Sequence, residues 1–396
     1  MTDDYPPLEA EVRRRIKAAG PMSVAQYMTI CLTHPQHGYY ITRDPFGAKG
    51  DFITAPEITQ MFGELIGLWC AATWRAMGAP ENVRLVELGP GRGTMMQDAL
   101  RAMHIVPDFR KAVVVHMVEI SPKLEQQQRQ ALSGTDVPVD WHQSIEQVPD
   151  GPTIIIANEF VDALPVHQAV MCVDGWHERV IKIADNGSLQ FSHARDPIPL
   201  FDQMLPRPLR NAPIGAIFEW RADQIALEIG RRVVHSHGAA LIVDYGHTQS
   251  AAGDTFQAVG RQTFTDPLNS PGTVDLTAHV DFHALAHAAQ ALGADIHGPI
   301  DQATFLRRLG IETRAEALKK GAPLGKTAEV NSALTRLTAS EGTGMGKLFK
   351  AMAVADPKIG ELPGFEKEQP AGASPAPPLF PSPASGGGKG RGRQPG

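Results

Sequence analysis

One short segment, VRLVELGPGRG at residues 83–93, constrains the fold of this chain more than any other. An apolar run ends in Glu87, and glycines then follow at alternate positions, namely Gly89, Gly91 and Gly93. The helix-favouring stretch TMMQDALRAM comes next. Glycines permit a tight turn that lets a ligand approach the backbone, and a helix that starts there directs its first N–H groups at that ligand. The segment therefore predicts a strand, a ligand-binding turn and a helix.

The spacing of this turn discriminates between cofactors. The dinucleotide fingerprint is G-x-G-x-x-G, which places a pyrophosphate at the helix N-terminus, whereas this chain has E-x-G-x-G-x-G. A carboxylate at the strand tip is a poor neighbour for phosphates. It suits a cationic ligand with an amino-acid end, such as S-adenosylmethionine, whose sulfonium and ammonium groups are both positive.

A second acid supports the same cofactor. Glu119 ends the apolar run AVVVHMVEI, 26 residues after Gly93, about where such folds place a ribose-binding carboxylate. We expect S-adenosylmethionine to be held by Glu87, Gly89, Pro90, Gly91, Gly93, Thr94 and Glu119.

Composition and charge exclude several classes of protein. The chain has 37 basic and 43 acidic side chains, a net charge of −6, so no overall positive field attracts it to nucleic acid. No stretch approaches the roughly 18 apolar residues of a membrane span. The three cysteines are far apart and odd in number, which fits a reducing compartment. The N-terminus is acidic from its third residue, unlike a signal or transit peptide, so we expect a cytoplasmic protein.

The order of apolar segments predicts an α/β fold. Strands at 84–88, 113–119, 137–141 and 153–157 alternate with helical patterns, which indicates a parallel sheet. Short segments separated by DG and NG turns then predict antiparallel strands inserted at about 166–210. A helix at 222–237 and a strand at 239–246 resume the alternation, and residues 347–355 form a last strand.

These patterns divide the 396 residues into four parts. Residues 1–80 form a helical and lid segment with a long helix from Pro56, and residues 81–250 form the cofactor domain with its β insertion. Residues 251–360 complete the sheet and the substrate region. Residues 366–396 are rich in Pro, Ala, Ser and Gly, a composition that predicts a disordered basic tail.

A third motif, PTIIIANEFVDALPVHQ, carries the substrate prediction. Asn158, Glu159 and Asp162 follow the apolar strand, and open parallel sheets bind ligands at the carboxyl ends of their strands. We expect Asn158 to contact the cofactor. Two carboxylates beside a cationic cofactor imply a cationic substrate, and arginine fits best. Its guanidinium has a pKa above about 12 and poorly nucleophilic nitrogens, so carboxylates that draw its charge away assist attack on a methyl carbon.

Alternative interpretations stay open for these residues. Asp162 is also suited to capping a helix, and Glu159 to ordering the loop. Asp244 in VDYG either reaches the site or caps a turn. The segment GDFITAPE (50–57) either closes over the cofactor as a lid, with contacts from Phe52 and Thr54, or is an ordinary loop. The spacing of His34 and His37 allows metal binding, but no third ligand is nearby, so we expect no metal site.

Six motifs, in chain order, resemble the MidA-like methyltransferases: GDFITAPEITQMFGE, VELGPGRGTMMQDALR, VEISPKL, ANEFVDALPVHQ, VDYGH and DLTAHVDF. The resemblance runs from about residue 8 to 356. It implies a Rossmann-like class I methyltransferase sheet and a protein-arginine methyltransferase, with Asn158, Glu159 and Asp162 in the family's post-strand motif. From the charge argument above we expect Glu159 and Asp162 to be the catalytic residues. The implied reaction is symmetric dimethylation of an arginine in the 49-kDa subunit of respiratory complex I, in support of its assembly. Gln262 stands where many relatives carry His.

Two other functions remain compatible with the sequence. One is methylation of another protein or of a small molecule. The other is a non-catalytic assembly chaperone that retains the fold, against which the intact glycine and acid pattern argues. The sequence does not indicate the oligomeric state.

Overall fold

A mostly parallel sheet forms the centre of the larger part of the molecule. The computed structural model describes residues 5–43, 53–260, 263–341 and 344–366. The strands of this main sheet are β2 (Val83–Leu88), β3 (Val113–Val118), β4 (Val139–His142), β5 (Thr153–Asn158), β10 (Ala239–His247), β14 (Val280–Asp281), β15 (Asp295–Asp301) and β16 (Phe349–Ala355). Their order is β15-β16-β10-β5-β2-β3-β4, with β14 beside β10. The predicted α/β class with a largely parallel sheet is confirmed.

The register of the sheet brings the predicted motifs to one edge. Strands β10, β5, β2, β3 and β4 run parallel, and Leu88 at the end of β2 lies opposite both Val118 and Ala157. Strand β16 is antiparallel to its neighbours β10 and β15. The loops after β2, β3 and β5 therefore leave the sheet side by side.

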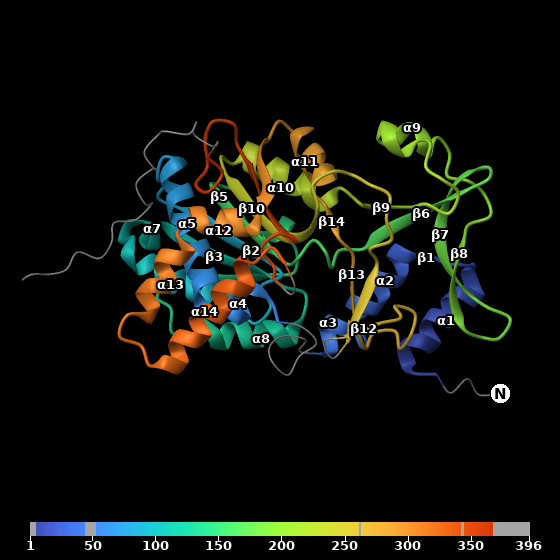
Figure 1. The fold of residues 1–396 in the computed structure, drawn as a ribbon, viewed down its shortest axis with the longest axis horizontal. Coiled ribbons are helices and arrows are strands. Elements are labelled where there is room, and N and C mark those ends of the chain that lie inside the picture. Colours follow the sequence, from blue (N-terminus) through green and yellow to red (C-terminus); the bar gives the residue numbers. More distant parts are fainter. Residues whose placement is uncertain (1–4, 44–52, 261–262, 342–343, 367–396) are drawn as a thin grey trace, which may run out of the picture.

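Helices cover both faces of the main sheet (Figure 1). The helices of the chain are α1 (Pro7–Ala19), α2 (Val24–Thr33), α3 (Tyr39–Thr42), α4 (Ala55–Ile58), α5 (Gln60–Ala76), α6 (Thr94–Ala102), α7 (Pro107–Ala112), α8 (Pro122–Ala131), α9 (Phe201–Met204), α10 (Gln224–His235), α11 (Phe282–Gln290), α12 (Gln302–Arg308), α13 (Ile311–Lys319) and α14 (Leu324–Thr338), with short 3-10 turns η1 (Met103–Ile105), η2 (Ile145–Gln147) and η3 (Arg207–Leu209). Ile154 and Ile156 pack with α5, α6 and α12–α14, whereas Ile155 packs with α10 and α11. Because successive side chains of a strand point to opposite faces, a strand covered on both sides is apolar throughout.

Glycines let α5 and α6 approach closely. A Cβ added to Gly67 would lie 2.7 Å from Ala99 Cα, and one added to Gly63 would lie 2.7 Å from Asp98 Cβ. The contact fixes α6, whose first residue follows the glycine turn, against the helix that covers the sheet.

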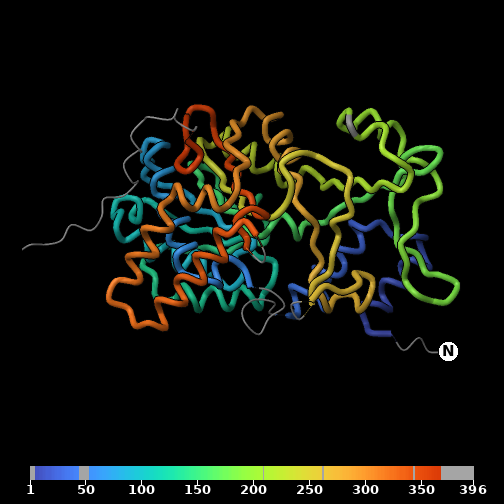
Figure 2. Tube along the Cα trace, in the orientation of Figure 1, coloured from blue at the N-terminus to red at the C-terminus, as the bar shows by residue number. Residues whose placement is uncertain are grey.

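A smaller body lies beside the main sheet. Its antiparallel strands are β1 (Met22–Ser23), β6 (Val166–Cys172), β7 (Gly175–Ile183), β8 (Leu189–His193) and β9 (Ile217–Arg221), and a separate three-stranded sheet contains β11 (Gln257–Gly260), β12 (Thr263–Thr265) and β13 (Asp275–Thr277). Side chains of α1 and α2 share one buried cluster with Ile181 and Leu276. Figure 2 shows blue, green and yellow segments, distant in sequence, gathered in this body.

The long helix predicted from Pro56 is interrupted. Thr59 adopts an extended conformation (φ −165°, ψ 143°) between α4 and α5, and its hydroxyl accepts a hydrogen bond from Met61 N. A threonine that caps the following helix stabilises the break. Residues 7–42 belong to the smaller body, whereas α5, after the break, packs on the main sheet.

Within the described ranges, no helix has the length and apolar character that a membrane span requires.

Candidate active site

The glycine turn has the conformation that its sequence requires. Gly89, Gly91 and Gly93 have φ angles of 62°, 54° and 81°, in the left-handed region that side chains rarely adopt. A Cβ on Gly89 would lie 2.7 Å from Phe160 Cδ2. Gly93 N donates to the carbonyl of Pro90 at 2.9 Å, and Gly93 caps α6. The turn thus exposes backbone rather than side chains to the space beyond the strand ends.

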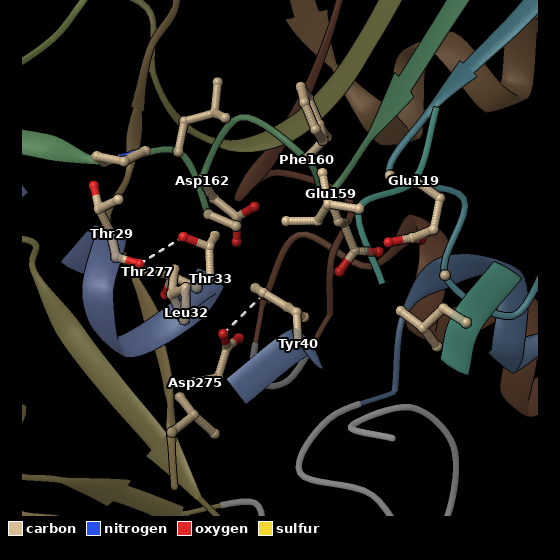
Figure 3. Close-up of a pocket in the computed structure, with 18 of the residues that line it drawn as sticks. Thr29, Leu32, Thr33, Tyr40, Glu119, Glu159, Phe160, Asp162, Asp275 and Thr277 are labelled. Atoms are coloured by element: carbon tan, nitrogen blue, oxygen red, sulfur yellow. Dashed lines mark hydrogen bonds between the residues drawn. The ribbon is translucent and has the colours of Figure 1, made fainter. Parts of the chain in front are cut away.

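A cavity of about 250 Å³ opens beside this turn. It is lined by Gly89 and Gly91, by residues of the loops after β3 and β5, by α2 and α3, and by β13. Figure 3 shows its labelled acids, Glu119, Glu159, Asp162 and Asp275. Among the described residues that line it there is no lysine, arginine or histidine. The cavity is therefore suited to cationic ligands.

Two acids lie at the turn end of the site. Glu119 accepts hydrogen bonds from Ser121 N (2.7 Å) and Gln128 Nε2 (3.0 Å), and burial raises its pKa to about 7. Glu87 is 2% exposed and does not line the cavity. Burial and the nearby Glu119 raise the pKa of Glu87 to about 8. Gln128, which the sequence did not indicate, also donates to Gly91 O at 2.7 Å and so links the turn to Glu119.

Glu159 occupies a strained position directly after β5. Its φ is 48°, and its Oε1 accepts from Ala55 N at 2.9 Å and from Asn158 Nδ2 at 3.4 Å. Burial raises its pKa to about 7. The hydrogen bond from Ala55 N shows that Glu159 orders the loop after β5, the alternative that the sequence left open. This role is compatible with a further role in catalysis. A strained backbone at a cavity wall is a frequent feature of functional sites.

Asp162 is held from several directions. It is 6% exposed, burial raises its pKa, and Tyr245 hydrogen-bonds its carboxyl group. Asp244 Oδ2 accepts hydrogen bonds from the backbone N–H groups of Val161 (2.9 Å) and Asp162 (3.1 Å), so Asp244 orders the turn that follows β5. No helix of the described chain begins at Asp162, so the helix-cap alternative for this residue is wrong.

Arg221 supports the same turn. Its partly buried guanidinium donates to the carbonyl oxygens of Leu164 (3.2 Å), His279 (2.8 Å), Asp162 (3.1 Å) and Ala278 (2.6 Å). Two chain segments that connect the main sheet to the smaller body are therefore joined by one side chain.

Comparisons with known proteins identify the family. A family model described as S-adenosyl-L-methionine-dependent methyltransferase matches residues 65–300. The chain belongs to this methyltransferase family. A solved methyltransferase-like structure from Burkholderia thailandensis, bound to S-adenosyl-homocysteine, superimposes with a TM-score of 0.79 at 28% identity, covering 90% of this chain and 94% of the other.

Named relatives of this methyltransferase are similar over most of their length. The Drosophila melanogaster protein arginine methyltransferase NDUFAF7 homolog is 38% identical, over 88% of this chain and 84% of its own. Protein arginine methyltransferase NDUFAF7 of Homo sapiens is 36% identical, over 79% and 75%. Both are named as mitochondrial proteins. That finding contradicts the expected cytoplasmic location, which is wrong.

The residues of the methyltransferase site fit its cofactor, S-adenosylmethionine. Two buried acceptor atoms, Glu87 Oε2 and Asn158 Oδ1, have no hydrogen-bond partner within the described part of the chain. Unpartnered buried acceptors are costly, and a bound ligand with positive charge and N–H donors would satisfy them. The exposed backbone of the turn and the acids Glu87 and Glu119 suit the same ligand.

Other predicted cofactor residues lie around the cavity rather than in its wall. Thr94 Oγ1 donates to Glu57 Oε1 at 2.6 Å, and Thr54 is buried and precedes α4. Neither lines the cavity. Phe52, Gln262 and the tail from 367 lie outside the described residues. His34 Nδ1 accepts from the backbone of Gln36 and His37, both at 3.2 Å, as in an ordinary turn.

One side of the cavity was not predicted from the sequence. Tyr40, Asp275 and Thr277 line it from α3 and β13, far from the cofactor motifs in sequence. Tyr40 Oη donates to Asp275 Oδ1 at 2.8 Å. The only signal was the motif DLTAHVDF, which begins with Asp275 and carried no predicted role.

Proposed function

We propose that this methyltransferase methylates an arginine side chain of a protein. The observation that carries the proposal is the charge of the cavity, where Glu119, Glu159, Asp162 and Asp275 face no cationic side chain among the described lining residues. The names of the relatives, protein arginine methyltransferases, support the same acceptor.

The turn end of the site holds the cofactor in this proposal. The backbone of Gly89, Pro90, Gly91, Gly93 and Thr94 faces it across the helix N-terminus, Glu119 accepts hydrogen bonds from its ribose, and Glu87 and Asn158 satisfy its cationic amino-acid end. Thr54, which is buried directly before α4, completes this set of cofactor residues. S-adenosylmethionine supplies an electrophilic methyl group when bound.

Glu159 and Asp162 act on the acceptor. Hydrogen bonds reach only Oε1 of Glu159 among the described residues, so Oε2 is available to a substrate N–H. Each methylation of a guanidinium nitrogen releases one proton, and a carboxyl group with a pKa of about 7 is suited to accept it near neutral pH. Asp162 accepts a second N–H, which draws the positive charge away from the attacking nitrogen.

The substrate that we propose is the 49-kDa subunit homologue of respiratory complex I, with symmetric dimethylation of one arginine in support of complex assembly. The resemblance to the MidA-like family carries this choice. A protein segment also suits a cavity that opens between the main sheet and the smaller body, since the loops around it come from both.

Two measurements test the proposal. Calorimetry with S-adenosylmethionine is expected to detect binding to the full chain and loss of binding in Gly91→Val, because a branched side chain there is incompatible with the left-handed turn. Mass spectrometry of the 49-kDa subunit homologue, incubated with enzyme and cofactor, is expected to find a symmetric dimethylarginine.

Variants at Glu159 identify the acceptor chemistry. Glu159→Gln is expected to abolish methylation and to leave cofactor affinity nearly unchanged, whereas Glu329→Gln, on the exposed face of α14, is a matched control with full activity. Full activity of Glu159→Gln would refute the role given to this carboxylate. Cofactor binding without any arginine methylation would favour a different acceptor, and absence of cofactor binding would favour a chaperone.

A further inference from the structure

The single helical turn α4 contacts both ends of the candidate site. Its first residue, Ala55, donates its backbone N–H to Glu159 Oε1 at 2.9 Å. Its third residue, Glu57, reaches the start of α6, where Glu57 Oε1 accepts a hydrogen bond from Thr94 Oγ1 at 2.6 Å and Glu57 Oε2 lies 3.8 Å from Arg92 Nη1. Arg92 and Thr94 belong to the glycine turn and to the first turn of α6. One turn of helix therefore joins the cofactor end of the site to a carboxyl group of the acceptor end.

The position of α4 depends on contacts of this kind. It has four residues, far fewer than an isolated helix needs to be stable. The extended conformation of Thr59 separates α4 from α5, so the two do not form one continuous helix. The first N–H groups of a helix have no acceptor within that helix. Glu159 supplies the acceptor for Ala55 N, and the side chain of Glu57 supplies a second attachment.

The attachment by Glu57 is well suited to hold α4 against α6. The Glu57 side chain is only 18% exposed, and its 2.6 Å bond to Thr94 is in the short range of charge-assisted O–H···O⁻ hydrogen bonds. A carboxylate is also favourable beside a helix N-terminus, and α6 begins at Thr94. The glycine turn has another support, because Gln128 Nε2 donates to Gly91 O at 2.7 Å. Loss of the Glu57 contacts should therefore release α4 rather than the turn.

The other contact of α4 acts on the carboxyl group that the proposed function needs. Glu159 lies between Asp162 and Glu119 in the view of Figure 3, where the two ends of the cavity meet. The bond from Ala55 N engages Oε1 of Glu159 and leaves Oε2 for an acceptor. Burial raises the pKa of Glu159 to about 7, and the bond from Ala55 N opposes part of that rise. The position of α4 thus affects both the orientation and the ionisation of this group.

We propose that Glu57 is a positioning residue for methyl transfer, which holds α4 against the start of α6 and so keeps Ala55 N on Glu159. This inference rests on the proposed arginine methylation, in which Glu159 accepts the proton. Glu57 does not line the cavity, so it acts through α4 rather than on the cofactor or the acceptor. Without Glu57, α4 is free to move away from Glu159, and the ionised carboxylate loses a donor.

The first test is the pH profile of arginine-peptide methylation at saturating S-adenosylmethionine. Glu57→Leu is expected to shift the acid limb of kcat/KM to higher pH by about one unit, the effect of losing one hydrogen bond to a carboxylate. A raised pKa leaves less of the carboxylate ionised, so kcat/KM should fall about tenfold on the acid side and stay nearly unchanged on the alkaline side. A loss of folded protein alone would lower the amplitude and leave the limb in place. Affinity for S-adenosyl-homocysteine should be nearly unchanged, because Gln128 still holds the turn.

Three further variants separate positioning from other effects. Glu57→Gln retains an oxygen that accepts from Thr94 Oγ1, so its acid limb should lie close to that of the unchanged protein. Thr94→Val removes the donor at nearly constant volume and should shift the limb in the same direction as Glu57→Leu. Glu329→Leu introduces the same residue on the exposed face of α14 and should leave the profile in place.

A double-mutant cycle tests the coupling without any substrate. Denaturant unfolding at about pH 8, where Glu159 is mostly ionised, compares Glu57→Leu, Glu159→Leu and the double variant. The bond from Ala55 is already absent in Glu159→Leu, so a second loss through Glu57 should cost less there. The unfolding equilibrium constant of the double variant should differ from the additive value by about threefold to tenfold. Glu329→Leu combined with Glu159→Leu should be additive.

The outcomes distinguish this inference from the proposed function. If the unchanged enzyme methylates arginine while the acid limb of Glu57→Leu coincides with its own, or the cycle is additive, the role of Glu57 is overturned and arginine methylation stands. If the unchanged protein binds S-adenosyl-homocysteine but methylates no arginine, the proposed function fails, and the cycle alone decides on the coupling of Glu57 to Glu159. Should Glu57→Leu not fold, Thr94→Val decides on both measurements.

Discussion

Binding of the cofactor should release protons, because the acids at the turn end are buried without a cation. Burial raises the pKa of Glu87 to about 8 and that of Glu119 to about 7. A bound ligand that carries sulfonium and ammonium groups stabilises the ionised form of a nearby carboxyl group and lowers its pKa. The protons that the empty site holds near neutral pH are therefore expected to leave when S-adenosylmethionine binds.

The size of the release follows from the two pKa values. At pH 7 the protonated fraction of Glu87, with a pKa of about 8, is about 0.9, and that of Glu119, with a pKa of about 7, is about 0.5. If both groups are ionised in the complex, about 1.4 protons are released for each cofactor bound. At pH 9 the same calculation gives only about 0.1 proton. Affinity should accordingly rise with pH between about 6 and 7.5, a range in which the α-ammonium group of the cofactor, with a pKa of about 7.7 to 8, stays mostly protonated.

Calorimetric titration in two buffers measures this number directly. Phosphate and Tris differ strongly in ionisation enthalpy, so the difference in observed binding enthalpy gives the protons released. Glu87→Gln should remove about 0.9 of them at pH 7 and leave the contribution of Glu119. The control variant Glu329→Gln, at an exposed position, should release as many protons on cofactor binding as the unchanged protein. Equal binding enthalpies in the two buffers, or a release unchanged by Glu87→Gln, would refute the assignment of these acids to the cofactor.

Three further predictions concern stability. Glu87→Gln should stabilise the cofactor-free protein by up to about 3 kcal/mol at pH 7. Folding raises the pKa of the Glu87 carboxyl group from 4.5 to about 8, and such a group destabilises the folded protein as pH rises from about 4.5 to 8. The gain in melting temperature should therefore disappear near pH 4. Arg221→Met should lower stability by about 3 to 5 kcal/mol, since four part-buried carbonyl groups lose their charged donor; a melting temperature unchanged in this variant contradicts the reasoning. Gly67→Val should lower the free energy of unfolding by about 2 to 3 kcal/mol, because the new side chain clashes with Ala99. Denaturant unfolding measures this loss. The control is Gly325→Ala, at a helical glycine whose added Cβ meets nothing within 4 Å.

The sequence predicted the main sheet well because the signals for it are local. Strands at 84–88, 113–119 and 153–157 agree with β2, β3 and β5 within about one residue. Their apolar runs are long because both faces are covered by helices. The helix from Pro56 was predicted too long, since Thr59 is compatible with a helix in sequence and ends one only through a cap that depends on the conformation of its neighbours.

The arrangement of the smaller body was not predictable in the same way. Strand β1 has only two residues, and it pairs with β7 across more than 150 positions of sequence, Met22 lying opposite Ile181. Such a strand has no periodicity of its own. Its place is determined by the burial of α1 and α2 on the inserted sheet, a long-range contact that pattern analysis of one segment does not reveal.

The same distinction separates the two ends of the candidate site. Glycines that require positive φ and an acid at a strand tip identify the donor end within one stretch of sequence. The other end of the cavity is lined by Tyr40 and Asp275, which lie 235 positions apart and share a hydrogen bond. Neither residue type is unusual in its own segment, so only the fold shows that they lie together at the cavity. A variant that loosens the smaller body while leaving the main sheet intact should therefore impair acceptor binding before cofactor binding, since Gln128 of α8 holds both Glu119 and the glycine turn and is itself held by Trp141 of β4.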